Sequence, residues 1–355
     1  MSQENQNIQE EPHKRRGRYK GKYPRNYKEK YKELNPEKYQ DTIEKVIRKG
    51  STPAGMHISI MVREIIDFLK IKPGQTGFDA TLGYGGHTKA MLECLKGQGH
   101  MYATDVDPIE SAKTKKRLAD AGFGEDILTI RLQNFCTIDE IAKEAGGFDF
   151  VLADLGVSSM QIDNPDRGFS FKVDGPLDLR LNPENGISAA ERLAQIDEDE
   201  LAGMLWENSD EPYAEELAHA IVTERKHGKP IDTTTRLREV IEETLSFLPE
   251  KEKKDTVKKT CQRTFQALRI DVNNEFEVLY EFMEKLPGAL KPGGRAAILT
   301  FHSGEDKLVK KALKQGYKEG IYSEIANDVV RPSAEECAQN GRARSTKMRW
   351  AVRAE

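Results

Sequence analysis

The sequence contains few cysteines and no long apolar segment. Only four of its 355 residues are cysteine, and their spacing forms neither a Cys-x-x-Cys pair nor a zinc-binding pattern: Cys94, Cys136, Cys261 and Cys337. This usage predicts reduced thiols in a cytoplasmic protein. Because no run of about 18 apolar residues is present, we expect no membrane-spanning helix. The first twenty residues are polar and charged, so we expect no secretory signal there.

A strong net charge is also absent. The chain has 55 basic and 59 acidic residues, a net charge of −4. Residues 1–50 hold 14 of the basic and 8 of the acidic residues, which leaves 41 basic and 51 acidic residues for the rest. A basic arm on an acidic body argues against general coating of DNA, but it allows one local attachment to a polyanion.

The arm lacks aliphatic side chains where it is most basic. Residues 14–32 read KRRGRYKGKYPRNYKEKYK, which cannot pack a core, and we expect residues 1–50 to be disordered. Tyrosines recur every four residues at Tyr19, Tyr23, Tyr27 and Tyr31. One interpretation is an RNA-contacting arm, with phosphates neutralised by Lys and Arg and bases stacked on Tyr. The other is a solvated tail with no binding role.

Strands and helices alternate along the first half of the chain. We expect an amphipathic helix from residue 57, strands over 76–83, 100–105, 127–132 and 148–155, and helices over 86–95, 108–121 and 138–144. Such alternation with short connections is typical of a doubly wound sheet with parallel strands.

The alternation stops after residue 160 and resumes near residue 275. Residues 160–260 are charged and have the periodicity of helices, without a convincing strand. We then expect a helix over 275–286, a strand over 295–301, a helix over 306–313 and a strand over 347–352. The sequence therefore predicts an arm (1–50), an α/β domain in two parts (51–160 and 261–355) and an all-α insertion (161–260).

A glycine-rich turn joins the first strand to its helix. It reads Asp79-Ala-Thr-Leu-Gly-Tyr-Gly-Gly-His87, with Gly85 and Gly86 at the start of the helix. Such a turn lets the backbone approach a ligand, and a helix N-terminus favours electronegative groups. Asp105 ends the next strand, 20 residues after Gly85, where a carboxylate can accept hydrogen bonds from both ribose hydroxyls. Together these signals predict a nucleoside cofactor, whereas each alone would mark a turn or a helix cap.

The pattern of glycines favours one cofactor over another. Dinucleotide enzymes carry G-x-G-x-x-G, in which the third glycine allows close helix packing at the pyrophosphate. This chain has G-x-G-G-H-T, headed by Asp79. That arrangement resembles the first motif of class I methyltransferases, in which the head carboxylate lies near the methionine amino group. We therefore expect S-adenosyl-L-methionine rather than a nicotinamide dinucleotide, which an oxidoreductase would need.

Asp154 ends the strand FDFVLAD, at the edge where ligands bind in open α/β sheets. The segment DLGVSS that follows occupies the place where amino-directed methyltransferases usually carry an Asn/Asp-Pro-Pro-aromatic turn. This chain lacks that tetrapeptide. Taken alone, Asp154 could equally cap a loop.

Several longer blocks resemble those of the ribosomal RNA small subunit methyltransferase H family. They include DATLGYGGHT, ATDVDP, DLGVSSMQID, RGFSFKVDGPLDLRLNP, RTFQALRIDVNNE and LKPGGRAAILTFHSGED, and they cover residues 56–352 in the family's order. The resemblance implies a Rossmann-like class I methyltransferase fold with an inserted helical domain that helps to hold RNA. It also implies methylation of N4 of a cytidine in the decoding region, with the small ribosomal subunit as partner. The cofactor contacts that it implies come from Gly85, Gly86, His87, Asp105, Phe135, Asp154 and Gln161.

The chemistry of that reaction suggests further residues. The cytosine amino group is a poor nucleophile, so an acceptor must orient its hydrogens and a proton must leave. We expect Asp154 to be that acceptor, with Ser158 and Ser159 as weaker candidates and no metal. We expect Arg167, Arg180 and Arg263 to contact RNA. The alternative for such arginines is an internal salt-bridge network that ties the insertion to the α/β domain.

The chain departs from the family's usual pattern at a few positions. Tyr84 replaces a common Arg, Met160 a Pro after the two serines, and Gly304 a Leu. These changes cluster where RNA would be contacted. A relative acting on another cytidine is therefore one alternative, and a non-catalytic ribosome-assembly factor that binds RNA is another. The intact Gly85 and Asp105 argue against the second.

Overall fold

The computed structural model describes residues 59–355. Expectations for the basic arm and for the start of the first helix therefore lie outside the described residues. The described part forms one compact unit. None of its helices is long and apolar enough to cross a membrane. Its four cysteines are all free thiols.

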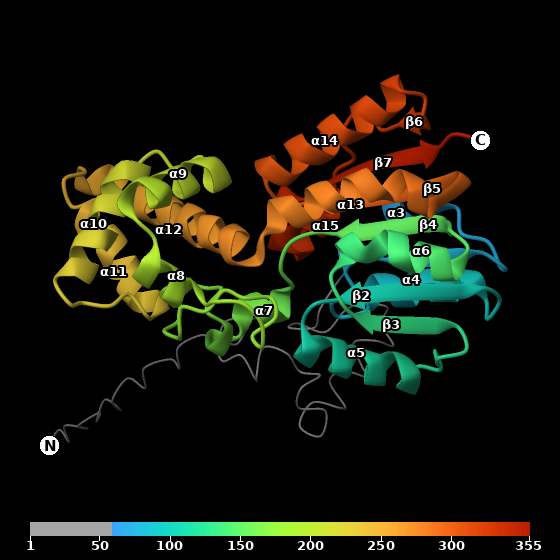
Figure 1. Cartoon of the computed structure of the whole chain (residues 1–355), viewed down its shortest axis with the longest axis horizontal. Helices are drawn as coiled ribbons and strands as arrows, with labels where there is room; N and C mark the ends of the chain where they lie inside the picture. Colours follow the sequence, from blue (N-terminus) through green and yellow to red (C-terminus); the bar gives the residue numbers. More distant parts are fainter. Residues whose placement is uncertain (1–58) are drawn as a thin grey trace, which may run out of the picture. The chain divides into compact units, whose positions relative to one another are not determined.

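The centre of the molecule is a seven-stranded sheet of order β3-β2-β1-β4-β5-β7-β6 (Figure 1). Its strands are β1 (Thr76–Asp79), β2 (His100–Asp105), β3 (Leu128–Leu132), β4 (Phe148–Asp154), β5 (Leu290–Thr300), β6 (Tyr322–Ile325) and β7 (Lys347–Arg353). The first five in chain order pair in parallel. The parallel pairing predicted for the strands of the first half of the chain is therefore confirmed. β7 runs antiparallel to both β5 and β6. Alternation of strands and helices predicts a layered sheet, but it does not fix the direction of a last strand inserted beside β5.

Most predicted elements agree closely with the structure. β2, β3 and β4, with the helices α4 (Gly86–Leu95), α5 (Pro108–Asp120) and α6 (Ile138–Ala145), begin and end within one residue of prediction. β1 ends at Asp79, four residues early, because the chain turns there into the glycine-rich loop. β6 was missed, because its sequence YSEI is short and mostly polar.

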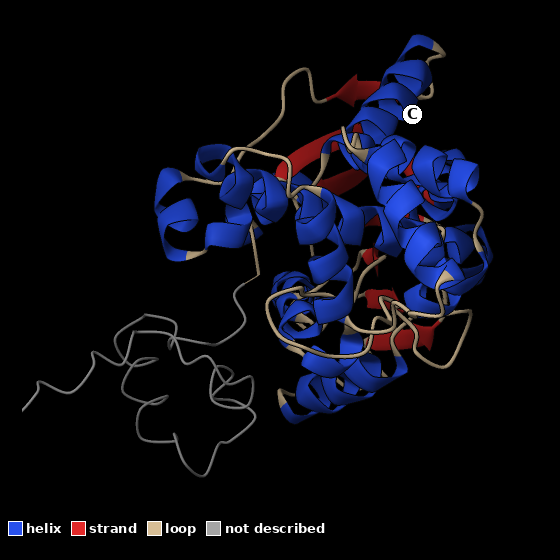
Figure 2. Cartoon of the chain, turned by 90° about the vertical axis from the view of Figure 1, so that its left-hand side faces the viewer, coloured by secondary structure: helices blue, strands red, loops and turns tan. Residues whose placement is uncertain are grey.

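Helices cover both faces of the sheet (Figures 1 and 2). Successive strand residues point to opposite faces. On β4, Val151 and Ala153 pack with α6, α13 (Glu275–Ala289) and α14 (Ser303–Lys318). Phe150 and Leu152 pack with α3 (Val62–Leu69), α4 and α5 on the other side. β4 is therefore buried on both sides, which explains its continuous apolar run.

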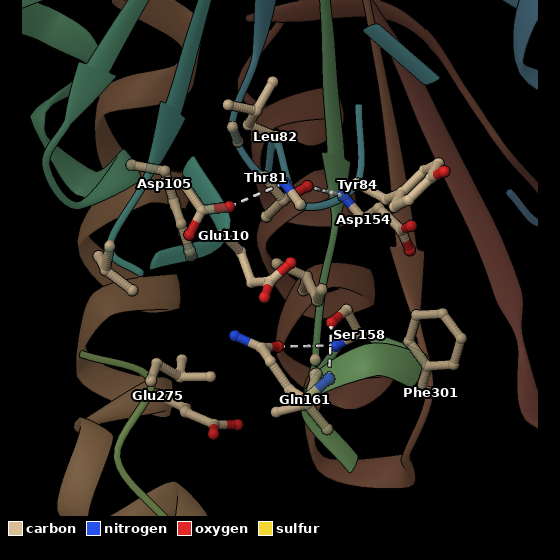
Figure 3. A pocket seen from close by; sticks show the side chains of 18 of the residues that line it. Thr81, Leu82, Tyr84, Asp105, Glu110, Asp154, Ser158, Gln161, Glu275 and Phe301 are labelled. Carbon is tan, nitrogen blue, oxygen red and sulfur yellow. Dashed lines mark hydrogen bonds between the residues drawn. The ribbon is translucent and has the colours of Figure 1, made fainter. Parts of the chain in front are cut away.

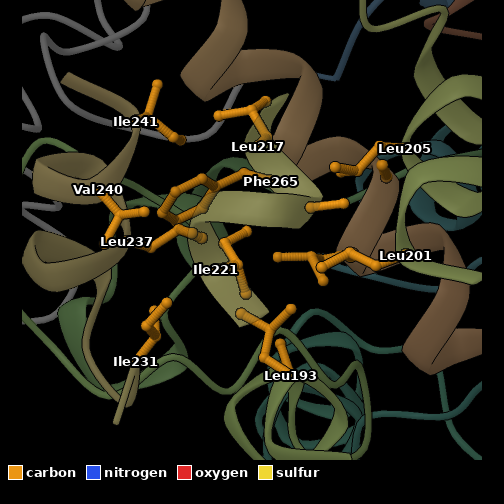
Figure 4. Close-up of a cluster of buried hydrophobic side chains, with 14 of the residues drawn as sticks. Leu193, Leu201, Leu205, Leu217, Ile221, Ile231, Leu237, Val240, Ile241 and Phe265 are labelled. Carbon is orange, nitrogen blue, oxygen red and sulfur yellow. The ribbon is translucent and has the colours of Figure 1, made fainter. Parts of the chain in front are cut away.

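Residues between β4 and β5 form a helical region with its own core (Figure 4). Its helices are α7 (Ser159–Asp163), α8 (Ala189–Gln195), α9 (Glu198–Ser209), α10 (Ala214–Lys226), α11 (Thr234–Thr244) and the first part of α12 (Glu250–Asn273). Buried side chains such as Leu205, Leu217, Ile241 and Phe265 meet there. As expected, no strand is present in residues 160–260, apart from one isolated bridge.

Helix α12 joins this helical region to the α/β part. Its 24 residues span about 36 Å and end at Asn273, directly before α13. The boundary that the sequence places after residue 260 falls inside α12, and the division into domains stays a prediction. Because α12 is continuous, its last turns belong to the wall of the site described below.

Candidate active site

A cavity of about 370 Å³ opens at the carboxyl ends of the parallel strands (Figure 3). This size lies within the usual range of small-molecule sites. Its lining residues fall into loops after β1, β2, β3, β4 and β5, with additional residues from the end of α12 and the start of α13: 80–87, 105–110, 133–135, 154–162, 266–279 and 301–305. The candidate residues that end separate strands are thus brought to one place.

The glycine-rich loop is held in shape by α5. Gly85 has a φ of 82°, and a Cβ atom there would lie 2.6 Å from Cγ2 of Thr114. The Thr114 hydroxyl donates to the carbonyl oxygen of Gly83 at 2.6 Å. Arg117 donates to the carbonyl of Tyr84 and lies over its ring, 3.6 Å from the centroid. Tyr84, which replaces the family's common Arg, therefore has a specific partner on α5.

Asp79, at the head of the motif, lies behind this loop. It is fully buried and does not line the cavity. One of its carboxylate oxygens accepts from the backbone N–H of Thr81 at 3.0 Å, and the other from the hydroxyl of Thr88 at 2.6 Å. Burial raises the pKa of this carboxyl group. The resemblance suggested a place beside the methionine amino group; in this structure Asp79 instead ties the loop to α4.

Asp105 lines the cavity at the end of β2. Its Oδ2 accepts from the backbone N–H of Gly83 at 2.7 Å, and its Oδ1 from that of Asp107 at 2.9 Å. Burial raises its pKa to about 6, against the opposing effect of these hydrogen bonds. Each oxygen keeps a second lone pair, so the carboxylate can still accept from two ribose hydroxyls. The geometry fits the role expected from the sequence.

Asp107 is the centre of a buried hydrogen-bond network that joins the α/β part of the protein to the segment after β4. Its Oδ1 caps α5. Its Oδ2 accepts from Nε2 of Gln161 at 2.9 Å and from Nη1 of Arg167 at 2.6 Å. Arg167 also donates to the carbonyl oxygens of Arg180 and Leu181, and only 6% of the residue is exposed. The expectation that Arg167 contacts RNA is therefore corrected: its guanidinium is sealed inside the protein by Asp107.

The other two arginines differ in exposure. Arg180 makes a bidentate pair with Asp178 at 2.8 and 2.7 Å and donates to the carbonyl of Gly186. Burial would raise the pKa of Asp178, but the hydrogen bonds from Arg180 hold it below its usual value. Arg180 is thus occupied by an internal contact, contrary to expectation. Arg263 has a side chain that is 39% exposed and only a 4.0 Å contact to Glu211, so it remains a candidate for RNA.

Phe135 provides an apolar wall after β3. It begins a short 3₁₀ helix, lines the cavity and packs edge-to-face on Phe282, with ring centroids 5.2 Å apart. Leu279 of α13 lines the same region. A flat apolar surface of this kind suits a purine ring. The sequence alone would have placed Phe135 in the core.

Ser158 and Gln161 form the turn that starts α7. Ser158 Oγ accepts from the N–H of Gln161 at 3.2 Å, and Gln161 Oε1 accepts from the N–H of Ser158 at 2.9 Å. Both residues line the cavity, as does Ser159. Because the Ser158 hydroxyl already caps this helix, its geometry suits positioning of Gln161 better than chemistry on a substrate.

Asp154 ends β4 beside His87. Nε2 of His87 lies 2.8 Å from the carbonyl oxygen of Ile60, and its Nδ1 lies 3.4 Å from Oδ2 of Asp154. The other oxygen of Asp154, Oδ1, is buried and has no hydrogen-bond partner among residues 59–355. Burial raises the pKa of Asp154 to about 6, although His87 opposes this. A buried oxygen without a partner needs an explanation, and the side chain as a whole is 26% exposed and lines the cavity, where the carboxylate could meet a substrate donor.

A second polar cluster, which the sequence did not predict, lines the other side of the cavity. Arg269 makes a bidentate pair with Glu275 at 2.7 and 2.8 Å. Glu275, His302 and Glu305 each have one atom able to bind a metal ion, a carboxylate oxygen or a ring nitrogen, and these three atoms lie within 4.8 Å of one another. A metal ion could be held by such a set, but Arg269 already supplies a positive charge to it. Arg269 and His302 lie 33 positions apart in the sequence, and no local pattern indicated that these side chains meet.

Gly304, another departure from the family pattern, is explained by packing. A Cβ atom at Gly304 would lie 2.6 Å from the ring of Phe276. The Phe276 ring packs edge-to-face on His302, with centroids 5.8 Å apart. Phe276 thus fills the space that a larger residue at 304 would take. This substitution therefore alters the packing around His302.

The fold and the site define a class of protein. A sheet with antiparallel β7 inserted beside β5 differs from the all-parallel dinucleotide fold, and together with the glycine-rich loop and Asp105 it defines a class I S-adenosylmethionine-dependent methyltransferase. Residues 54–354 match the MraW methylase family, and the chain belongs to that family.

Relatives with closely similar sequences are found in several bacteria. Ribosomal RNA small subunit methyltransferase H 1 of Agathobacter rectalis is 82% identical, covering 98% of this chain and 99% of the relative. The protein of the same name from Lachnoclostridium phytofermentans is 71% identical, with coverages of 98% and 94%. Ribosomal RNA small subunit methyltransferase H of Thioalkalivibrio sulfidiphilus is 37% identical, with coverages of 85% and 98%.

Solved structures resemble the chain only distantly. A SAM-dependent O-methyltransferase from Thermotoga maritima aligns with a TM-score of 0.39 at 12% identity, covering 88% of this chain and 71% of that one. The assignment therefore depends on the family match and on the sheet described above.

Proposed function

We propose that the protein transfers a methyl group from S-adenosyl-L-methionine to the N4 amino group of a cytidine in the decoding region of small-subunit ribosomal RNA. The observation that carries this proposal is the Asp154 carboxylate at the cavity edge, which is 26% exposed and has one oxygen without a partner among residues 59–355. A carboxylate can accept from an amino donor but cannot pair with a carbonyl. The names of the relatives support the proposal, as does the glycine-rich loop after β1, which lines the same cavity.

The residues present fit the cofactor. Asp105 has free lone pairs for the ribose, Phe135 offers a wall for the adenine, and the loop around Gly85 leaves backbone groups open at the start of α4. A Cβ atom at Gly86 would lie 2.0 Å from Oγ of Ser59, so a side chain there would require Ser59 to move. When bound, S-adenosyl-L-methionine supplies an electrophilic methyl group on a positively charged sulfur.

The chain's own residues prepare the amine. The Asp154 carboxylate accepts a hydrogen bond from the amino group and so fixes the direction of its lone pair. After transfer the nitrogen carries an extra proton, which passes to the Asp154 carboxylate beside His87. The target base must be unstacked to reach this cavity, which is easiest in single-stranded or loop RNA. Arg263, exposed on α12, is available to hold a phosphate of that RNA.

Two alternatives share this site. The protein could act on a different cytidine, since some relatives are named methyltransferase H 1 or H 2, whereas others of lower identity are named methyltransferase H without a number. It could also bind RNA without catalysis. The ordered contacts of Asp105 and the partnerless oxygen of Asp154 favour the enzyme over the binding factor.

The test combines labelled S-adenosyl-L-methionine with small ribosomal subunits from cells that lack this gene. The labelled nucleoside is identified by mass after digestion of the RNA. We expect N4-methylcytidine with the wild type and none with Asp154→Ala. Label on another nucleoside would overturn the target, and S-adenosylhomocysteine binding without any labelling would support the binding factor.

A further inference from the structure

Arg269 lies in the last turns of α12 and lines the cavity with part of its guanidinium uncommitted. Its Nε and Nη2 donate to the two oxygens of Glu275. Its Nη1 has no hydrogen-bond partner among the described residues. A bidentate pair fixes the plane of a guanidinium, so the direction of the remaining N–H groups is fixed as well.

The position of this group relative to Asp154 matters for substrate choice. Asp154 and Glu275 lie on opposite sides of the cavity in Figure 3. The negative charge of Glu305 raises the pKa of both Asp154 and Arg269. Glu305 is therefore close enough to interact with both groups. The cavity therefore offers an acceptor on one side and a fixed donor on the other.

Cytosine presents the complementary pattern on its base-pairing edge. Its N4 amino group is a donor, and its N3 and O2 are acceptors. Uracil has an acceptor at the N4 position, and adenine has no acceptor at the O2 position. A site with Asp154 on one side and a cation on the other would therefore match cytosine and reject uracil and adenine.

We propose that Arg269 donates a hydrogen bond from Nη1 to O2 of the target cytosine and so determines the base that the enzyme accepts. This inference rests on the proposed function, because it requires a cytidine in the cavity. Glu275 is the positioning residue, since it holds the guanidinium without touching the base. The charge of Arg269 also offsets part of the negative charge of Glu275 and Glu305, and for this reason we assign this cluster to base recognition rather than to a metal ion.

The test uses small subunits reconstituted from ribosomal RNA that carries either cytidine or 2-thiocytidine at the methylated position. Sulfur at position 2 is a weaker acceptor than oxygen. We expect the wild-type kcat/KM to fall about tenfold or more on the thio substrate, because a hydrogen bond to a charged group is weakened. Arg269→Gln should lose about 10- to 100-fold on cytidine and show no further loss on 2-thiocytidine.

Controls separate recognition from folding. Arg269→Gln leaves Glu275 without its partner, so the double variant Arg269→Gln/Glu275→Gln is measured beside it, with thermal unfolding and S-adenosylhomocysteine binding. Arg192→Gln breaks a comparable ion pair with Asp271 of α12 outside the cavity, and it should keep the full wild-type response to sulfur.

Each result decides the question. If kcat/KM of both Arg269→Gln and the double variant falls on 2-thiocytidine as much as that of the wild type, Arg269 does not bind O2. That result would leave the proposal of cytidine methylation unaffected. Equal rates of the wild type on the two substrates would also overturn the role of Arg269. Failure of the wild type to methylate unmodified cytidine would instead overturn the proposed function, and the inference with it.

Discussion

Nδ1 of His87 lies 3.4 Å from Oδ2 of Asp154. The other ring nitrogen of His87 lies 2.8 Å from the carbonyl oxygen of Ile60, which can only accept, so Nε2 carries the proton of the neutral ring. A proton shared with Asp154 must then come from the carboxyl group or from a charged imidazole. The relationship between these two residues therefore controls when Asp154 can act as an acceptor.

Activity should depend on the ionisation of Asp154. Burial raises its pKa to about 6, so the carboxylate is lost as the pH falls through that value. We expect kcat at saturating S-adenosyl-L-methionine to rise about tenfold per pH unit below pH 6 and to level above it, because the proposed acceptor is the ionised form. Saturation removes the effect of Asp105, whose pKa is also raised to about 6 and which would otherwise change cofactor binding over the same range. His87 opposes the raised pKa of Asp154, so His87→Asn should move the midpoint upward. The measurement is the pH–rate profile on small subunits.

Asp154→Asn is the matched control for this profile. It keeps the shape of the side chain but cannot take up a proton, and it should lower kcat by about 10²- to 10⁴-fold. S-adenosylhomocysteine binding by the variant should stay measurable. A variant with the wild-type profile would remove Asp154 from the mechanism.

Asp105→Ala should weaken cofactor binding. The change removes the acceptor for the ribose and releases the N–H of Gly83. We expect the dissociation constant of S-adenosylhomocysteine to rise about 10- to 100-fold, because hydrogen bonds to a charged group are lost. Asp120→Ala, an exposed carboxylate at the end of α5, should leave the constant unchanged. Isothermal titration checks both, and equal affinities for the two variants would refute the role of Asp105.

Gly85→Ala and Gly74→Ala separate two costs of adding a side chain. Both glycines have a positive φ, 82° and 88°, which costs an alanine about 1–2 kcal/mol. Only Gly85 is also crowded, because its Cβ would meet Thr114, whereas Gly74 has open space. We expect Gly85→Ala to lower the free energy of unfolding by about 1–3 kcal/mol more than Gly74→Ala. Urea denaturation measures the difference, and equal losses would show that the loop relaxes around the methyl group.

Arg167→Met should mainly reduce stability, whereas Arg263→Met should mainly reduce RNA binding. Removing Arg167 leaves Asp107 buried without its charge partner, which should cost about 3–5 kcal/mol of unfolding free energy. Removing the partly exposed Arg263, whose 4.0 Å contact with the buried Glu211 is too long for a hydrogen bond, should cost less, about 1 kcal/mol. It should instead weaken RNA binding and reduce the slope of log affinity against log salt by about 1.

Urea unfolding and RNA binding at several salt concentrations distinguish the two cases. A stable Arg167→Met protein with weakened RNA binding would restore the role first expected from the sequence. An Arg263→Met protein with an unchanged salt slope would remove α12 from the RNA surface.

Local patterns in the sequence determined much of this protein. The order of buried strands and helices, the glycine-rich loop and the carboxylates Asp105 and Asp154 at strand ends were all predictable. Each depends on a few consecutive residues whose periodicity or backbone needs are visible in the chain itself. Because parallel strands end at one edge of a sheet, the meeting of these loops in one cavity followed as well.

Tertiary structure alone decided the rest. The direction of β7, the burial of Asp79 behind its loop, the pairing of Arg167 with Asp107 and the approach of His302 to Glu275 involve partners that the fold selects. A charged residue reads the same in sequence whether it faces solvent or a buried opposite charge. Only packing, which removes water from one of these places and not from the other, determines whether an arginine such as Arg167 or Arg263 is left free to bind a ligand.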